Sequence, residues 1–403
     1  MGQRDSPQPG IRLLAPQTGA RPRPCLDAPV ARALARLPSR GPITVLVNDP
    51  QRHTASRAVL TELTRHVGTG RLRVLIASGS HVTPVAARAG FEREVLGDLP
   101  VAAVAWHDSR ADDLVSVGAA GSWRGHPWLL AAEGLFAIGS VEPHYFAGFT
   151  GAHKTATVGV AAHADIEANH AGALSPRCRP ARLDGNPVAE GIFAMLADLE
   201  RRRPVACVNL VQAGRAAIAA VGGAPREALA AAVADAEAAF VRRIDRPADA
   251  VLAEVTGPLG RSFYQADKGI KNCEWAVRDG GCIVLLAPCP AGIGQDHFVG
   301  LLREAQTHAA AAARVASRGY RLGDHKAVRL RYLTDPAARA VRVWIVSDGL
   351  SGEQADVLGL RKAASLGEAL AAAAVRPDRD AVYHVRDAGN VAVLAGPAPW
   401  PPD

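Results

Sequence analysis

Apolar runs that alternate with helix-periodic segments constrain the fold of this 403-residue chain most strongly. The runs ITVLVN (43–48), LRVLIA (72–77) and GLFAIGSV (134–141) are typical of buried strands, and a segment with helical spacing separates the first two. The pattern returns in GCIVLLAP (281–288) and VRVWIVSD (341–348). Strands that alternate with helices predict a parallel sheet. We therefore expect an α/β fold with mainly parallel sheets.

Chain length and a polar junction predict two α/β domains. A chain of 403 residues exceeds what one hydrophobic core usually organises, and the polar stretch IDRPAD (244–249) precedes a new apolar run. We expect a poorly ordered N-terminal segment over residues 1–26, an N-terminal domain over 27–245 that carries a cofactor, and a C-terminal domain over 246–403 that closes an interdomain active-site cleft. Helices are predicted at residues 56–67, 186–199, 226–243, 296–317 and 366–374.

Composition indicates a globular protein with a small anionic substrate. The net charge is +7, but arginines are spread along the chain and aromatics make up only 5% of it, which disfavours a nucleic-acid partner and suits an anionic ligand. The six cysteines form no CxxC pair, so free thiols in a reducing compartment are expected. A secretory signal and a membrane-length apolar run are both missing, so we expect a cytoplasmic protein without membrane contact.

Acid–base and ligand side chains concentrate between residues 139 and 170. This segment holds His144, His153, His163 and His170 together with Lys154. Small residues separate them, which lets backbone approach a bulky ligand closely. We interpret the segment as a cradle for a cofactor.

Further polar residues follow the predicted strand ends. Asp49, Arg52, His81 and His144 each come shortly after an apolar run. Ligands bind beyond the carboxyl ends of parallel strands. A single cleft is therefore expected to collect these side chains.

Known motifs leave one generic alternative open. A phosphate loop requires glycine directly before its lysine, whereas His153 precedes Lys154, and GxGxxG is missing after the first strand. A zinc-dependent hydrolase could use His144, His163 and His170 as ligands. Against it, no carboxylate occupies an obvious base position and Lys154 would repel the metal.

The segment PHYFAGFTGAHK (143–154), followed by Asn169 and His170, resembles the signature of the nickel-dependent lactate racemase family, the LarA-type 2-hydroxyacid racemases and epimerases. The resemblance covers about residues 27–396. Further matching motifs occur in the same order: NDPQR (48–52), ASGSH (77–81), HDSRADDLVSVG (107–118), DGNPVAEGIF (184–193), YQADKGIKNC (264–273) and APCPAGIGQDHF (287–298).

The resemblance implies a nickel pincer nucleotide that is made by biosynthetic enzymes of the host. Lys154 would be its covalent attachment point and His170 the protein ligand of square-planar nickel. Phe146 would stack on its pyridinium ring. His81 and His144 would be the acid–base pair, one for each enantiomer of a 2-hydroxyacid whose α-hydrogen leaves as hydride.

The resemblance also implies a set of substrate contacts. Arg52 would hold the substrate carboxylate through its planar fork, and Lys268 would add a second positive contact. Gln265 and Tyr264 would supply hydrogen bonds, although a solvated helix start explains them equally. Asp49 would orient a histidine or Arg52, or it serves only the turn before Pro50.

Several positions depart from the family pattern. The segment 49–52 reads DPQR rather than DxTR, Val82 and His153 stand where arginines are usual, and Val158 replaces a proline. These changes concern phosphate contacts and substrate identity. They keep a third hypothesis open, a non-catalytic relative that binds a nucleotide or anion.

Overall fold

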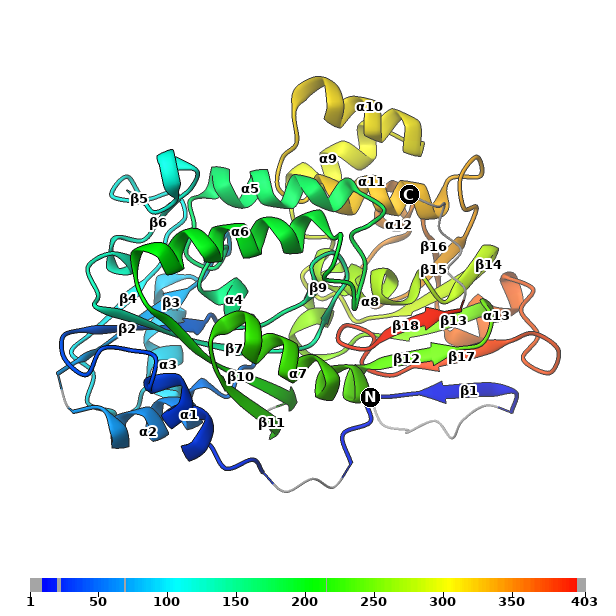
Figure 1. The fold of residues 1–403 in the computed structure, drawn as a ribbon. Coiled ribbons are helices and arrows are strands. Elements are labelled where there is room, and N and C mark those ends of the chain that lie inside the picture. Colours follow the sequence, from blue (N-terminus) through cyan, green and yellow to red (C-terminus); the bar gives the residue numbers. More distant parts are fainter. Residues whose placement is uncertain (1–8, 20–22, 69, 215, 397–403) are drawn as a thin grey trace.

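A computed structural model describes residues 9–19, 23–68, 70–214 and 216–396 of the protein. Two six-stranded sheets form its frame (Figure 1), and mixed α/β architecture with mainly parallel sheets confirms the predicted fold class. Among the described helices, none is long and apolar enough to cross a membrane. All six cysteines are free, as the sequence predicts, and only Cys25 is exposed.

The first sheet has the strand order β11-β10-β7-β2-β3-β4. Its neighbours pair in parallel except β10 and β11, which form an antiparallel hairpin. Every residue of β7 is buried, which explains its unbroken apolar run. The strands are β2 (Ile43–Asn48), β3 (Leu72–Ala77), β4 (Ala103–Trp106), β7 (Gly134–Ser140), β10 (Val205–Ala213) and β11 (Ala216–Gly223).

Helices connect these strands and cover the sheet (Figure 1). They are α1 (Asp27–Leu34), α2 (Ser56–His66), α3 (Val85–Val95), α4 (Ala152–Thr155), α5 (His163–Ala171), α6 (Pro187–Arg202) and α7 (Pro225–Phe240), with short 3₁₀ turns η1 (Ala119–Gly121), η2 (Pro127–Leu129) and η3 (Gly172–Leu174). Two small antiparallel pairs lie in the connections, β5 (Val115–Ser116) with β6 (Arg124–Gly125) and β8 (Pro143–His144) with β9 (Gly148–Phe149).

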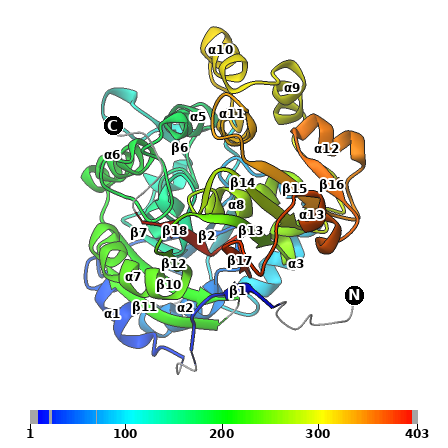
Figure 2. The same ribbon diagram turned by 90° about the vertical axis from the view of Figure 1, so that its right-hand side faces the viewer.

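The second sheet is parallel throughout and has the order β1-β17-β13-β14-β15-β16. Its strands are β1 (Ile11–Leu14), β13 (Ala248–Glu254), β14 (Val277–Leu286), β15 (Arg342–Val346), β16 (Arg361–Ala363) and β17 (Val382–Val385). Its helices are η4 (Gly257–Arg261), α8 (Phe263–Cys273), α9 (Asp296–Glu304), α10 (His308–Arg318), α11 (Asp324–Thr334), α12 (Gly352–Leu358) and α13 (Leu366–Ala372). In Figures 1 and 2, α9–α11 lie on the same side of the molecule as α5 and α6.

The N-terminal segment corrects one expectation. Residues 11–14, predicted to be poorly ordered with the rest of 1–26, form β1 and pair in parallel with β17 of the second sheet. Residues 1–8 and 20–22 lie outside the described part of the chain. Residues 11–14 are thus an edge strand of a sheet whose other strands lie between residues 248 and 385.

Two predicted helices end earlier than their periodicity suggests. The single helix expected over 296–317 is two helices, α9 and α10. Helix α9 ends where Arg331 donates hydrogen bonds to the carbonyls of Leu302 and Ala305. Helix α10 begins at Thr307, whose side chain accepts a hydrogen bond from Ala310 N. The helix expected over 226–243 ends at Phe240. Its last residues instead form β12 (Val241–Ile244), which pairs with β18 (Ala392–Ala395).

Candidate active site

The loops after β2, β3 and β7 meet the second domain in one cavity of about 830 Å³. All ten side chains that the sequence assigns to a site line this cavity: Asp49, Arg52, His81, His144, Phe146, Lys154, His170, Tyr264, Gln265 and Lys268. The first seven come from the first domain and the last three from α8. Strand ends in a parallel sheet gather on one edge, which explains the convergence.

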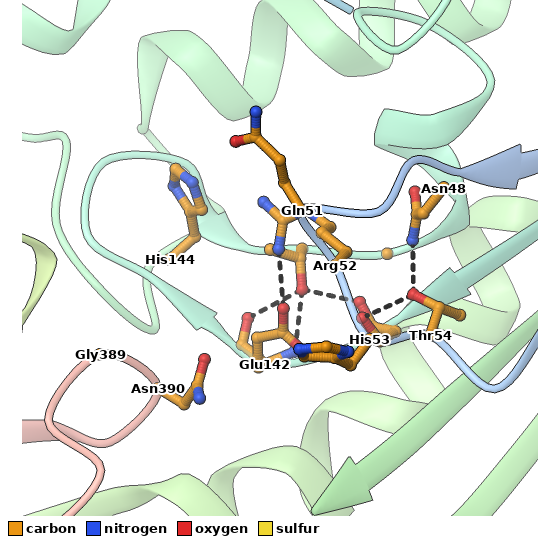
Figure 3. Close-up of polar contacts among 12 residues, drawn as sticks. Asn48, Gln51, Arg52, His53, Thr54, Glu142, His144, Gly389 and Asn390 are labelled. Carbon is orange, nitrogen blue, oxygen red and sulfur yellow. Dashed lines mark hydrogen bonds and ion pairs between the residues drawn. The ribbon is translucent and has the colours of Figure 1, made fainter. Parts of the chain in front are cut away.

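Hydrogen bonds fix the turn that follows β2. Asn48 Nδ2 donates to Thr54 Oγ1 at 2.7 Å (Figure 3), and Thr155 Oγ1 donates to Asn48 Oδ1 at 2.9 Å. Asn48 therefore connects the turn that carries Arg52 to α4, which carries Lys154. The side-chain amide of Asn48 thus helps to position both Arg52 and Lys154.

Helix α4 lies against β7 because Gly139 has no side chain. A Cβ at Gly139 would lie 2.2 Å from Ala152 N, which no packing could accommodate. Asn209 Oδ1 accepts from the same Ala152 N at 2.8 Å and satisfies the start of the helix. This close approach places Lys154 at the wall of the cavity.

Lys154 is a partly buried amine with other positive charges nearby. Its pKa lies well below the ordinary lysine value because burial disfavours the ammonium ion, and Arg52 and Lys268 add repulsion. Its Nζ lies 5.5 Å from the ring centroid of Phe146. A neutral amine is nucleophilic and can form an amide or thioamide bond.

The Phe146 ring beside this lysine packs against three histidines. The Phe146 ring lies 4.5 Å from His144, 5.0 Å from His170 and 4.8 Å from His325, centroid to centroid. Burial lowers the pKa of His170 to about 3, and Lys154 and His81 contribute. Since a neutral imidazole is the metal-binding form, His170 could hold a transition metal.

The two other cavity histidines differ in their surroundings. Burial, followed by Lys154, holds the pKa of His144 well below its usual value. His81 is more exposed, and its Nδ1 lies 2.8 Å from Asp49 Oδ2. The contact with the carboxylate fixes the ring of His81 and favours a proton on Nδ1, which leaves Nε2 as the base.

Two cations, Arg52 and Lys268, also line the cavity. Arg52 Nη1 donates to Glu142 Oε1 at 2.8 Å (Figure 3). Burial, with repulsion from Arg52 and Lys326, lowers the pKa of Lys268 to about 7. Both groups face the same cavity, so together they suit a carboxylate ligand. Helix α8, which the sequence could also place at a solvated surface, is instead largely buried.

His153 does not belong to this cavity. It is fully buried and stacks on Phe193 at 5.3 Å between centroids, and burial lowers its pKa to about 3. Both of its ring nitrogens lack a hydrogen-bond partner among the described residues. The residue that replaces the family's arginine therefore points into the core between α4 and α6.

The zinc ligands considered from the sequence do not form a metal-binding group among the described residues. Within the described residues, one group of three side chains could hold a metal ion, because its ligand atoms lie within 4.8 Å of one another. This group is Asp27, Glu62 and His66, on α1 and α2. His144 and His170 line the same cavity as His163, yet no such group forms among them. This argues against the zinc-hydrolase alternative.

The second domain supplies cavity residues that the sequence did not reveal. His325 forms hydrogen bonds through both ring nitrogens. Its Nε2 lies 2.9 Å from Tyr145 Oη, and its Nδ1 lies 2.7 Å from Tyr320 Oη. Lys326 Nζ donates to Tyr264 O at 2.7 Å. The matching motifs gave no signal for these residues, because the last motif ends at residue 298 and α10 lies between it and α11.

Comparison with known families decides the assignment. The chain matches the lactate racemase N-terminal domain over residues 23–180 and the lactate racemase C-terminal domain over residues 244–394. It belongs to the lactate racemase family. As a member of that family, the protein is classed as an isomerase.

Relatives span much of the chain. Lactate racemase of Thermoanaerobacterium thermosaccharolyticum is 27% identical over 292 residues, which cover 69% of this chain and 67% of the relative. Lactate racemase of Lactiplantibacillus plantarum is 26% identical over 295 residues, 68% of this chain and 66% of the relative.

Solved structures share the fold over nearly the whole length. The lactate racemase apoprotein of T. thermosaccharolyticum has a TM-score of 0.81 at 24% identity and covers 96% of both chains. A Thermotoga maritima protein solved by structural genomics has a TM-score of 0.71 at 16% identity, with 92% of this chain and 97% of the other covered.

Proposed function

We propose that the protein is a racemase or epimerase of a 2-hydroxyacid and that it uses a nickel pincer nucleotide tethered to Lys154. The observation that supports this most directly is the convergence of Lys154, His170, His81 and His144 on one cavity that also contains the cations Arg52 and Lys268. Family membership supports the racemase activity, and the names of the relatives support lactate or a similar acid as substrate.

The residues present fit such a cofactor. Lys154 is partly buried and has a lowered pKa, which suits a covalent thioamide rather than a free ammonium ion. His170 offers a neutral imidazole, a good ligand for nickel. Between them lies the Phe146 ring, on which a pyridinium ring could stack. When bound, the cofactor would accept a hydride from the substrate α-carbon and return it.

The side chains of the protein would carry out the remaining steps. Arg52 and Lys268 would bind the substrate carboxylate and hold the α-carbon in a fixed place. His144, neutral at physiological pH, would take the hydroxyl proton of one enantiomer. His81, oriented by Asp49, would take that of the other through Nε2. The planar 2-keto acid would keep its carboxylate contacts. The other histidine would have to carry a proton on the nitrogen that faces the substrate, and it would give this proton to the oxygen as the hydride returns, while the first histidine passes its proton to solvent.

The test is intact-protein mass spectrometry with metal analysis on protein co-expressed with a pincer-making pathway. An adduct on Lys154 and about one nickel per chain are expected. Lys154→Ala should abolish both, whereas the matched control Lys362→Ala, a lysine outside the cavity, should keep them. His144→Ala should retain the adduct and lose turnover. An unmodified wild-type chain, with the pathway active on another racemase, would overturn the proposal.

A further inference from the structure

A stack of aromatic rings connects the two domains beside the active-site cavity. The ring of His144 stacks on Tyr145 at 5.2 Å between centroids and 21° between planes. Tyr145 in turn stacks on His325 at 6.0 Å and 27°, and His325 stacks on Tyr320 at 6.1 Å and 21°. The first two residues lie at the end of β8, whereas the other two lie at the start of α11 and shortly before it. The proposed base His144 is therefore one end of a stack whose other end belongs to the second domain.

Hydrogen bonds hold His325 at both ends of its ring, from Nε2 to Tyr145 Oη and from Nδ1 to Tyr320 Oη. Burial holds the pKa of His325 well below its usual value, so the ring is neutral and donates from one nitrogen only. Gly323 N donates to Tyr320 Oη at 3.3 Å, which favours donation of the Tyr320 hydrogen to Nδ1. The other nitrogen, Nε2–H, then donates to Tyr145 Oη. The two phenols thus fix the orientation of the His325 ring.

Three neighbouring residues of α11 contact Tyr145. Besides the bond from His325, Arg329 Nη1 donates to the Tyr145 backbone carbonyl at 3.3 Å. Lys326 Nζ and Arg329 Cζ lie 5.1 and 5.6 Å from the centroid of the Tyr145 ring. Tyr145 directly follows His144 in the chain, so α11 holds the backbone next to the proposed base.

The His144 ring has only one weak hydrogen bond to hold it. Among the described residues, this bond comes from Ala147 N to Nδ1 at 3.3 Å, longer than the usual range of about 2.7–3.2 Å. The rings of Tyr145 and Phe146 lie beside it, at 5.2 and 4.5 Å between centroids. Phe146 also packs edge-on against His325 at 4.8 Å. Both rings that contact His144 therefore contact His325 as well, and through them the second domain can set the orientation of His144.

Core packing alone would not need these polar groups. An apolar ring at position 325 would fill similar space without removing nitrogens and hydroxyls from water. Directional hydrogen bonds add a single orientation, which packing by itself specifies less well. A base must meet its proton within hydrogen-bond distance, so an ordered ring matters more at His144 than elsewhere in a core. The buried polar chain therefore suits a positioning role.

We propose that His325 is a positioning residue for the base His144 and that it acts through Tyr145. The inference rests on the proposed function for the role of His144. The second domain supplies neither of the two proposed bases, yet it sets the orientation of one of them. Docking of α11 against the first domain thus becomes part of assembling the acid–base pair.

Nuclear magnetic resonance on the protein without cofactor tests the link independently of turnover. The carbon–proton signal of His144 Cε1 is assigned by its loss in His144→Ala, and relaxation dispersion reports whether the ring exchanges between orientations. His325→Phe keeps a ring in the stack and removes both of its hydrogen bonds, and Tyr145→Phe removes one hydroxyl group only. Both should introduce dispersion that the wild type lacks. His308→Phe, at an edge-on contact with a tyrosine outside the cavity, should not. Flat dispersion in both stack variants would overturn the proposal.

Turnover by the enzyme loaded with its cofactor gives the size of the effect. His325→Phe and Tyr145→Phe should each lower kcat at least about tenfold and change KM less than about threefold, because a misplaced base slows proton transfer without weakening carboxylate binding. Nickel content should match that of the wild type. The double variant should be within about twofold of the slower single variant, since both substitutions break the same hydrogen bond.

Two kinetic results would contradict action through Tyr145. One is a kcat within threefold of the wild type in both single variants, and the other is a pair of losses that multiply in the double variant. A loaded wild type without turnover of any 2-hydroxyacid would overturn the proposed function instead. The dispersion measurement, which needs no cofactor, would still decide whether His325 orders the His144 ring.

Discussion

At the scale of single residues, the cavity holds two lysines, Lys154 and Lys268, whose pKa values are lowered beside one arginine. Arg52 lowers the pKa of both Lys154 and Lys268, after burial as the larger cause. The outcome differs for the two lysines, because Lys268 keeps a pKa of about 7 and can still carry a charge near neutral pH. An incoming carboxylate therefore meets one permanent and one titratable cation.

Carboxylate binding is expected to weaken above pH 7. Lys268 is protonated below its pKa of about 7 and neutral above it, and only the ammonium form attracts the anion. The Kd of 2-hydroxyisobutyrate, which has no α-hydrogen to transfer, should be constant below pH 6 and rise above pH 7 by up to tenfold per unit. Calorimetry across pH 5.5–8.5 measures this change.

An arginine at the same position provides the control. Lys268→Arg keeps the positive charge over the whole range, because the guanidinium does not titrate in proteins. Its Kd profile should be flat between pH 6 and 8.5. A wild-type profile without any rise above pH 7 would show that Lys268 does not contact the ligand.

At the scale of elements, the sequence predicted the strands better than the helix ends. The strands β2 and β3 have the predicted bounds because each is a mainly apolar run in which five of the six residues are buried. The prediction of one helix over 296–317 was wrong, because Arg331, distant in the sequence, donates hydrogen bonds to carbonyls at the end of α9. Such a tertiary contact leaves no periodic signal.

The contact between β7 and α4 should be sensitive to one methyl group. Gly139→Ala would place a Cβ 2.2 Å from Ala152 N, and backbone on both sides cannot yield without moving α4. We expect a loss of stability of at least about 1–3 kcal/mol, the usual cost of overpacking, together with misplacement of Lys154. Urea unfolding gives the first quantity, and the yield of adduct on Lys154 gives the second.

A glycine in open surroundings is the matched control. Gly300 lies within α9, and a Cβ there would meet no atom within 4 Å. Gly300→Ala should stabilise the protein by about 0.5–1 kcal/mol, since alanine loses less backbone entropy than glycine in a helix. Equal effects of the two substitutions would mean that the tight approach of α4 to β7 does not matter.

At the scale of the whole molecule, the cavity residues of the first domain could be predicted from the sequence, whereas those of the second domain could be predicted only in part. Asp49, His81 and His144 follow strand ends, where a parallel sheet gathers its site. His325 lies on α11, whose sequence DHKAVRLRYLT reads as a surface helix although nine of its eleven residues are buried. Contacts with α8, with α9 and with Tyr145 of the first domain bury these polar residues, and no local pattern in the sequence reports such tertiary contacts.

Helix α11 is expected to couple the two domains through Arg329. Its Nη1 donates to the carbonyls of Tyr145 and Cys178 at 3.3 and 3.2 Å, and its Nη2 pairs with Glu274. Arg329→Met removes all three contacts and leaves Glu274 buried beside Lys271 alone. Breaking a buried pair costs about 3–5 kcal/mol, and loss of the bonds to the first domain should separate the unfolding of the two domains.

Urea unfolding followed by tryptophan fluorescence and by far-UV circular dichroism tests this coupling. The wild type should show coincident transitions, and Arg329→Met an earlier first transition with the two signals apart. Arg314→Met breaks the half-exposed pair with Glu304 and should change stability by no more than about 1 kcal/mol. If Arg329→Met unfolds like Arg314→Met, the domains are held together by apolar packing, and the buried charges of α11 serve the cavity alone.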